Sequence, residues 1–141
     1  MKRTATAIWR GDLRTGPGAL TTESGALAEI PFAFETRFGE ANGANPEELI
    51  AAAHASCFSM ALASELVRAA VADPTISTMA TIQLRHIGGV LQITSSHLDV
   101  VISAEGADRT KLEAAALHAK LNCPVSKLLR AEVTMLTVCS T

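Results

Sequence analysis

The chain has 141 residues, of which 48% are hydrophobic, and this size and composition suit a single compact domain over residues 1–141. Its formal net charge is −2 and it has no basic run, so we expect no general attraction to nucleic acid or to an anionic membrane. Aromatic residues make up only 4% of the chain, which argues against a surface on which bases stack.

The N-terminus does not have the pattern of a signal peptide. Lys2 and Arg3 provide a basic start, but Arg10 and Asp12 interrupt the chain before an apolar stretch forms. The most apolar segment, residues 49–66, carries several polar residues and falls short of the roughly 20 predominantly apolar residues of a membrane span. We therefore expect a soluble, cytoplasmic protein that does not associate with membranes.

The first elements in chain order are predicted to be strands. Residues 4–10 and 19–23 alternate apolar and polar side chains. The Gly-Pro-Gly of residues 16–18 favours a turn between them, so this region is predicted to form a β-hairpin. Residues 33–38 are predicted to form a third short strand, and a polar loop is expected over residues 39–45.

A long helix is predicted to follow, from Pro46 to about Ala70. Asn45 can cap this helix, and Pro46 suits the first helical position. Glu47 and Glu48 face the positive end of the helix dipole. Apolar and small residues then occur on almost all sides, so we expect the helix to be buried at the centre of the fold.

The second half of the chain is predicted to contain a long hairpin, two helices and a closing strand. These elements are expected over residues 76–87 and 90–104 for the hairpin, 108–121 and 124–129 for the helices, and 131–138 for the strand. The apolar stripe of the first of these helices is predicted to be Leu112, Ala115, Ala116 and Ala119. This order of elements indicates an α+β fold, with antiparallel sheets packed around the long buried helix.

The three cysteines are an odd number, which argues against a static disulfide framework and favours thiol chemistry, metal binding or plain packing. Cys57 is predicted to lie in mid-helix among apolar neighbours, where it would be inert unless a cation stood beside it. Cys123 precedes Pro124 and so falls at the N-cap of the last short helix, where the amides stabilise a thiolate. By environment alone Cys123 is the more reactive of the two. Cys139 is expected to be a packing or surface residue.

A metal site is one alternative for the same residues. His54 lies three residues before Cys57, and His118 lies five before Cys123, so two Cys and two His could in principle bind zinc. These residues lack the short paired spacings of zinc knuckles, so we expect no metal and no other cofactor. His54 is expected to be a hydrogen-bonded core or interface residue.

Two segments around Cys57 and Cys123 resemble the signature motifs of the OsmC/Ohr family of thiol peroxidases. They are NPEELIAAAHASCFSM over residues 45–60 and NCPVS over residues 122–126. Three N-terminal segments are similar to the OsmC branch in particular, namely WRGD over residues 9–12, TTESG over residues 21–25 and FETRF over residues 34–38. The resemblance extends over nearly the whole chain, and the order and separation of the two cysteine motifs make it specific.

The resemblance implies an intertwined homodimer with two active sites at the subunit interface. It implies that Cys57 is the peroxidatic cysteine and Cys123 the resolving one. Matched residue by residue, it implies that Arg37 is the activating arginine and Glu47 its carboxylate partner, and that this pair reaches Cys57 from the other subunit. The neighbouring Glu48 remains the alternative partner of Arg37. Taken alone, Arg37 and Glu47 are ordinary strand-surface and helix N-terminal residues.

The implied reaction is the reduction of organic hydroperoxides, and less well of hydrogen peroxide, through a sulfenic acid and a Cys57–Cys123 disulfide. A dithiol reductant would reopen the disulfide, and a lipoylated protein is one candidate for it. The alternative is a non-enzymatic redox sensor or ligand-binding dimer that uses the same cysteines for a stoichiometric switch.

Overall fold

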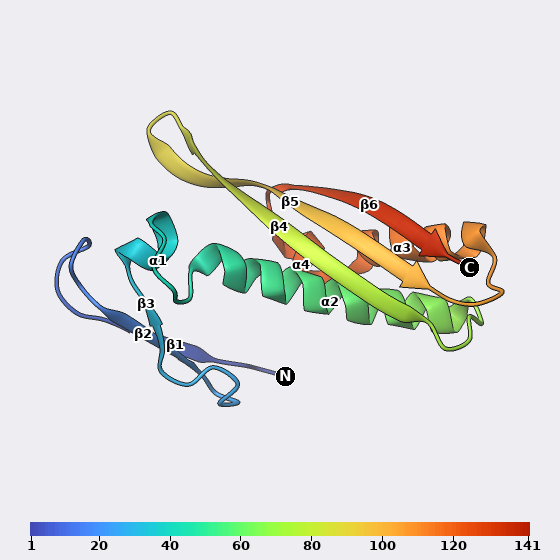
Figure 1. The fold of residues 1–141 in the computed structure, drawn as a ribbon, viewed down its shortest axis with the longest axis horizontal. Coiled ribbons are helices and arrows are strands. Elements are labelled where there is room, and N and C mark those ends of the chain that lie inside the picture. Colours follow the sequence, from blue (N-terminus) through green and yellow to red (C-terminus); the bar gives the residue numbers. More distant parts are fainter. The chain divides into compact units, whose positions relative to one another are not determined.

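The computed structural model describes all 141 residues, Met1–Thr141 (Figure 1). The backbone forms two compact units, Met1–Leu49 and Ile50–Thr141. Each unit contains one three-stranded sheet. The single domain expected over residues 1–141 stays a prediction.

The first unit contains the predicted N-terminal hairpin. Strands β1 (Ala5–Trp9) and β2 (Gly18–Thr22) pair antiparallel, and β3 (Ile30–Phe32) pairs antiparallel with the other edge of β2. Gly18 lies directly beneath the ring of Phe32, where a Cβ would come within 2.5 Å of the ring carbon. The glycine therefore allows the ring to pack against the strand.

The third strand was predicted over residues 33–38, and this prediction is wrong. The strand ends at Phe32, and α1 (Phe34–Phe38) follows as a short helix. The Thr36 hydroxyl accepts the Ala33 N–H at 2.9 Å and donates to the Ala44 carbonyl at 2.8 Å, which stabilises the helical turn. Phe34 and Phe38 are four residues apart, a spacing that suits one face of a helix.

The second unit contains a sheet in the order β4-β5-β6. Strands β4 (Thr75–Ile87) and β5 (Val90–Ser103) form the predicted long antiparallel hairpin. Strand β6 (Glu132–Ser140) pairs parallel with β5, so the sheet is mixed and not antiparallel as expected. The reason is that two helices intervene between β5 and β6, and such a crossover lets the chain return in the same direction.

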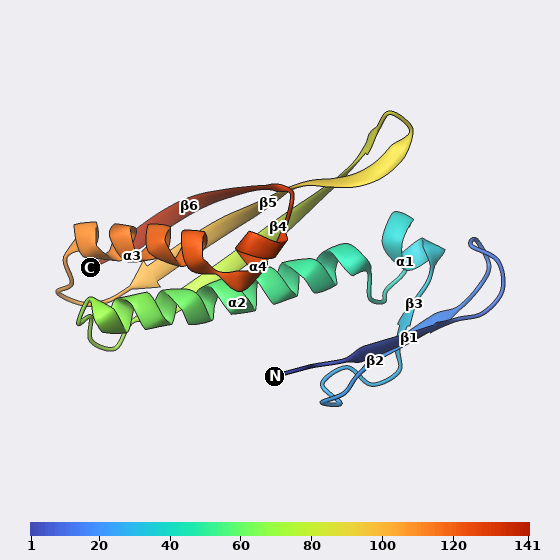
Figure 2. The ribbon, with the colours of Figure 1, turned by 180° about the vertical axis from the view of Figure 1, so that it is seen from behind.

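Helix α2 (Pro46–Arg68) begins as predicted, with the Asn45 side chain accepting the Glu48 N–H at 2.8 Å. One stripe of this helix is fully buried, at a spacing of four residues, and consists of His54, Phe58, Leu62 and Leu66. The apolar members of this stripe belong to one core cluster with Leu98, Val100 and Ile102 of β5. Helices α2, α3 and α4 lie on the same face of the sheet (Figure 2).

The expectation that α2 is buried on all sides is not met in the single chain. Met60 is 75% exposed and Val67 is 74% exposed, because the sheet covers only one side of the helix. By length and composition alone, α2 is long and apolar enough to cross a membrane. Its buried stripe packs instead against protein side chains of the core cluster, which is how the central helix of a soluble fold behaves.

Helices α3 (Arg109–Asn122) and α4 (Pro124–Leu128) follow the hairpin. Asp108 caps α3 by accepting the Thr110 N–H at 2.8 Å. The predicted stripe of α3 is confirmed, since its four members are all buried: Leu112, Ala115, Ala116 and Ala119. Cys123 lies between the two helices as the C-cap of α3 and the N-cap of α4.

Candidate active site

Cys57 and Cys123 lie side by side in the second unit. Cys57 is on α2 and partly buried, and the Cys123 thiol and the Val125 N–H are close enough to it for both to shift the pKa of its thiol. Cys123 is fully buried, and both thiols are free. Two cysteines that are 66 residues apart in sequence are thus brought together by the fold, as a disulfide between them would require.

The backbone between α3 and α4 explains the position of Cys123. Its N–H donates to the Ala119 carbonyl at 2.8 Å, and its own carbonyl accepts the Lys127 N–H at 3.0 Å. Pro124 occupies the first position of α4, where no backbone donor is needed. The predicted N-cap position is confirmed, but the side chain makes no capping hydrogen bond, and its thiol interacts with Cys57.

The surroundings of Cys57 within this unit oppose ionisation. Burial raises the pKa of the Cys57 thiol, because a thiolate loses hydration there. The Val125 N–H lowers this pKa in part, and the neighbouring Cys123 thiol raises it again. Cys57 is therefore mostly protonated at neutral pH in these surroundings, and a cation from outside the unit would be needed to make it a strong nucleophile.

His54 is fully buried one helical turn before Cys57 and has a partner on each ring nitrogen. Its Nδ1 atom is 2.7 Å from the Ser96 hydroxyl on β5, and its Nε2 atom is 2.8 Å from the Ser126 hydroxyl on α4. Burial lowers the pKa of His54, so the imidazole is neutral at neutral pH. The expectation of a hydrogen-bonded core histidine is confirmed, although the two serines were not foreseen.

The four residues considered as zinc ligands, His54, Cys57, His118 and Cys123, do not form a metal site in the structure. His118 lies on the surface with its Nδ1 atom 3.9 Å from Glu65, whereas both nitrogens of His54 have serine partners. No group of three His, Cys, Asp or Glu side chains is placed to hold a metal ion.

Arg37 and Glu47 form a bidentate ion pair in the first unit. The Nε atom of Arg37 donates to Glu47 Oε2 at 3.2 Å, and Nη2 donates to Oε1 at 2.7 Å. Glu48, the alternative partner, contributes its backbone N–H to the Asn45 cap and forms no salt bridge with Arg37. The guanidinium carbon also lies 5.1 Å from the centre of the Phe38 ring. A pair held at two points has a fixed orientation.

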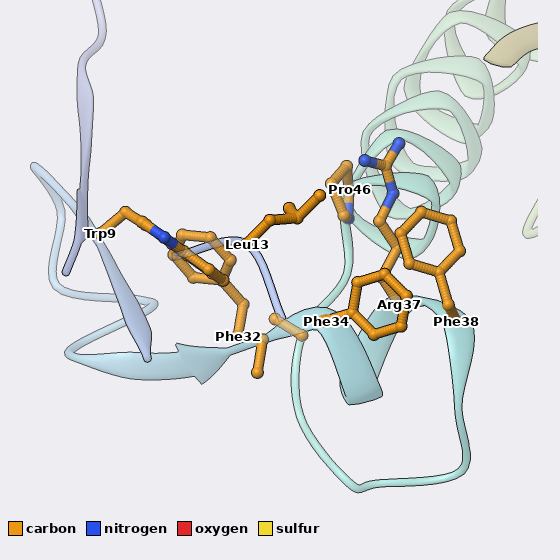
Figure 3. Close-up of a pocket in the computed structure, with 9 residues that line it drawn as sticks. Trp9, Leu13, Phe32, Phe34, Arg37, Phe38 and Pro46 are labelled. Carbon is orange, nitrogen blue, oxygen red and sulfur yellow. The ribbon is translucent and has the colours of Figure 1, made fainter. Parts of the chain in front are cut away.

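An apolar cavity of about 300 Å³ adjoins Arg37 in the first unit (Figure 3). It is lined, apart from Arg37, by aromatic and aliphatic residues: Trp9, Leu13, Phe32, Ala33, Phe34, Phe38, Ala44 and Pro46. Aromatic contacts fix the walls, since the Trp9 and Phe32 rings are 5.5 Å apart and those of Phe34 and Phe38 are 4.9 Å apart. The cavity was not predicted from the sequence, although the two phenylalanines that flank Arg37 at helical spacing, Phe34 and Phe38, were a signal for it.

Cys139 is not among the residues that act on the Cys57 thiol. It is on β6, partly buried, and packs against the core cluster of the second unit. Burial raises the pKa of its thiol, and the carboxylate of Glu113 raises it further. This environment suits a packing residue, as expected from the sequence.

Comparison with known proteins agrees with the motifs. A sequence model of the family described as OsmC-like protein matches residues 39–137. The chain is 42% identical over 129 residues to peroxiredoxin OsmC of Escherichia coli, covering 92% of this chain and 90% of that protein. Peroxiredoxin OsmC of Shigella flexneri matches to the same extent.

Solved structures share the fold. The organic hydroperoxide resistance protein OhrB of Bacillus subtilis superposes with a TM-score of 0.68 at 24% identity, covering 97% of this chain and 98% of that one. An OsmC-like protein of unknown function from Vibrio cholerae gives a TM-score of 0.73 at 16% identity, covering 98% and 99%. The match to the family model, together with the extent of identity to a curated member, shows that this chain belongs to the OsmC-like protein family.

Proposed function

We propose that this chain, a cysteine-based peroxidase, reduces organic hydroperoxides, and less well hydrogen peroxide, with Cys57 as peroxidatic and Cys123 as resolving cysteine. The observation that carries the proposal is the proximity of these two free thiols, because a two-cysteine peroxidase must form a disulfide between its cysteines. The relatives support it, since two are named peroxiredoxin and another is named an organic hydroperoxide resistance protein.

Cys57 needs a cation in order to react, and Arg37 is the residue we assign to this role. A guanidinium is charged at every relevant pH and can stabilise a thiolate as well as the developing charge on a peroxide oxygen. Glu47 binds two of its N–H groups, which leaves the others for the sulfur and the peroxide. Without this pair, burial keeps Cys57 protonated.

We assign the Arg37–Glu47 pair to the active site of a partner copy in an intertwined homodimer. Glu47 and Cys57 are ten residues apart on α2, which corresponds to about 15 Å of helix rise and exceeds the reach of a hydrogen bond. The exposed apolar side of α2, with Met60 and Val67, supports burial against a second chain. Two such sites would form per dimer.

The reaction balances with these residues alone and an external dithiol. The Cys57 thiolate attacks one peroxide oxygen, the O–O bond breaks, and the leaving alkoxide takes up a proton to become an alcohol. Cys57 is then a sulfenic acid. The Cys123 sulfur attacks the Cys57 sulfur, water leaves, and a disulfide forms. A dithiol reductant, for which a lipoylated protein is a candidate, returns both thiols through a mixed disulfide.

The apolar cavity beside Arg37 supports the preference for organic substrates. A peroxide whose oxygen interacts with the guanidinium can place its alkyl or aryl group among the aromatic walls, and hydrogen peroxide has no such group. We place the reaction in the cytoplasm, where dithiol reductants are maintained.

The test is turnover. Purified protein with dithiothreitol is expected to consume many equivalents of cumene hydroperoxide per subunit, and the Cys57→Ser variant is expected to consume almost none. Consumption of one equivalent followed by arrest would instead support the redox sensor. Full activity of Cys57→Ser would refute the assignment of Cys57.

A further inference from the structure

His54 takes no part in the reaction proposed for Cys57 and Cys123, although it is buried, hydrogen-bonded at both nitrogens and one helical turn before Cys57. Its two partners come from different elements, Ser96 from β5 and Ser126 from α4. The histidine therefore connects the sheet, α2 and α4 through one imidazole ring. A buried polar residue in an otherwise apolar core stripe needs such partners to offset its desolvation.

Helix α4 is joined to α2 by one side-chain hydrogen bond. It is only five residues long and has no fully buried side chain. A helix of this length has no stability of its own in water. That hydrogen bond joins Ser126 to His54, and Val125 adds apolar packing, since both Val125 and Cys57 pack against the core cluster.

The interaction of the Val125 N–H with Cys57, which lowers the pKa of that thiol, changes during the reaction. The Cys57 sulfur changes from thiol to thiolate to sulfenic acid to disulfide, and its hydrogen bonding changes at each step. The bond between His54 and Ser126 involves no reacting atom and can persist in every state. Ser126 is three residues after Cys123, in the same short segment, so a bond that fixes Ser126 also limits the movement of the resolving thiol.

We propose that His54 is a positioning residue for the resolving step, holding the Cys123–Ser126 segment beside Cys57 through the Ser126 hydroxyl. This proposal rests on the assignment of Cys57 and Cys123 above. Two rates then depend on different residues. The rate of attack on the peroxide depends on Cys57 and its cation, whereas the rate of disulfide formation depends on the His54–Ser126 bond. When resolution is slow, the sulfenic acid survives long enough to react with a second peroxide and become a sulfinic acid.

The test measures the two rates separately in Ser126→Ala, which removes one hydroxyl from α4. The rate of peroxide attack is measured in a Cys123→Ser background by loss of the Cys57 thiol, and is expected to stay within about twofold of the parent. Disulfide formation in the otherwise intact protein is expected to slow about tenfold, equivalent to about 1.4 kcal/mol in the barrier. Mass spectrometry is expected to find about tenfold more sulfinic acid on Cys57 per turnover, because resolution and over-oxidation compete.

Three further variants complete the experiment. Thr78→Val removes a different 2.8 Å hydrogen bond of α2, from Ser59 to Thr78 on β4, and is expected to leave disulfide formation within about twofold of wild type. Ser126→Thr restores a hydroxyl on α4 and is expected to restore resolution. His54→Phe is expected to reproduce the Ser126→Ala pattern.

The outcomes distinguish this proposal from the proposed function. If wild-type protein shows no turnover, the proposed function fails. If wild type turns over but Ser126→Ala resolves as fast as wild type, the role of His54 is refuted. If peroxide attack and resolution fall together in Ser126→Ala, or if Thr78→Val has the same effect, the bond supports the fold in general and the positioning role is equally refuted.

Discussion

The guanidinium of Arg37 donates to both carboxylate oxygens of Glu47, at 3.2 Å from Nε and 2.7 Å from Nη2. The pair is partly sheltered, with the arginine side chain 34% exposed and the glutamate side chain 15% exposed. This relationship gives the arginine a fixed plane and direction. In our account it supplies the positive charge that the surroundings of Cys57 lack.

Removal of this charge is expected to slow peroxide attack. Arg37→Ala is expected to lower kcat/KM for cumene hydroperoxide by about 100-fold to 1,000-fold, the usual cost of losing a preorganised charge at a reacting centre. Arg37→Lys is expected to recover only part of this loss, because an ammonium cannot bind the carboxylate bidentately. Glu48→Gln serves as the control and is expected to retain activity, since Glu48 does not pair with Arg37.

The same variant is expected to change the pH dependence of peroxide attack. Burial raises the pKa of Cys57, and a nearby guanidinium lowers it, so loss of Arg37 leaves the raised value. The thiolate is the nucleophile, so the rate in Arg37→Ala is expected to be low at neutral pH and to rise as the solution becomes alkaline. A profile that rises at the same pH in wild type and variant would show that Arg37 does not act on this thiol.

The aromatic cavity is expected to determine substrate preference. Phe34→Ala removes part of its wall and is expected to lower kcat/KM for cumene hydroperoxide about tenfold, with less than about twofold effect on hydrogen peroxide. Ile8→Ala, in the same unit but outside the cavity lining, is the matched control. Equal losses with both peroxides would argue against binding of the organic group there.

Stability is expected to fall in mildly acidic solution because of His54. Burial holds its pKa in the folded state below the ordinary value of 6.5, so the unfolded chain binds more protons as the pH falls. The contribution of this group is therefore complete above pH 6.5 and declines as the pH falls from there through the folded pKa. Urea unfolding between pH 5 and 7 checks this, and the His54→Phe variant is expected to show a flatter dependence. An equally steep dependence in the variant would point to other groups.

The exposed side of α2 is expected to be a dimer surface. Met60→Glu puts a charge on this surface and is expected to convert dimer to monomer in sedimentation experiments, with loss of most activity. Met60→Leu keeps the apolar surface and is expected to stay dimeric and active. A wild-type protein that sediments as a monomer would contradict the dimer.

Local sequence signals predicted most of the elements, because caps, turns and apolar periodicity act over a few residues. The Asn45 cap, the Cys123 N-cap and the stripe of α3 are examples. The elements that were predicted wrongly are those whose structure depends on residues elsewhere in the chain. The helical turn at Phe34–Phe38 depends on a bond from Thr36 to Ala44, and the parallel pairing of β6 depends on how two helices return the chain to the sheet.

In the candidate site, too, the local motifs could be predicted from the sequence and the long-range contacts could not. The cysteine motifs were visible in sequence, but the Ser96–His54–Ser126 connection joins residues up to 72 positions apart, and no local pattern predicts it. The cavity beside Arg37 likewise gathers residues from β1 to the start of α2. Such contacts follow from packing and become visible only in the folded chain.

Mixed dimers test the central claim most directly. Arg37→Ala and Cys57→Ser subunits, each expected to have little or no activity alone, are unfolded together and refolded so that the subunits reassort. If Arg37 of one copy activates Cys57 of the other, each mixed dimer contains one complete site. The mixture is then expected to recover about a quarter of wild-type activity, because half of the dimers are mixed and each has one of two sites. A mixture no more active than its parents would contradict the account.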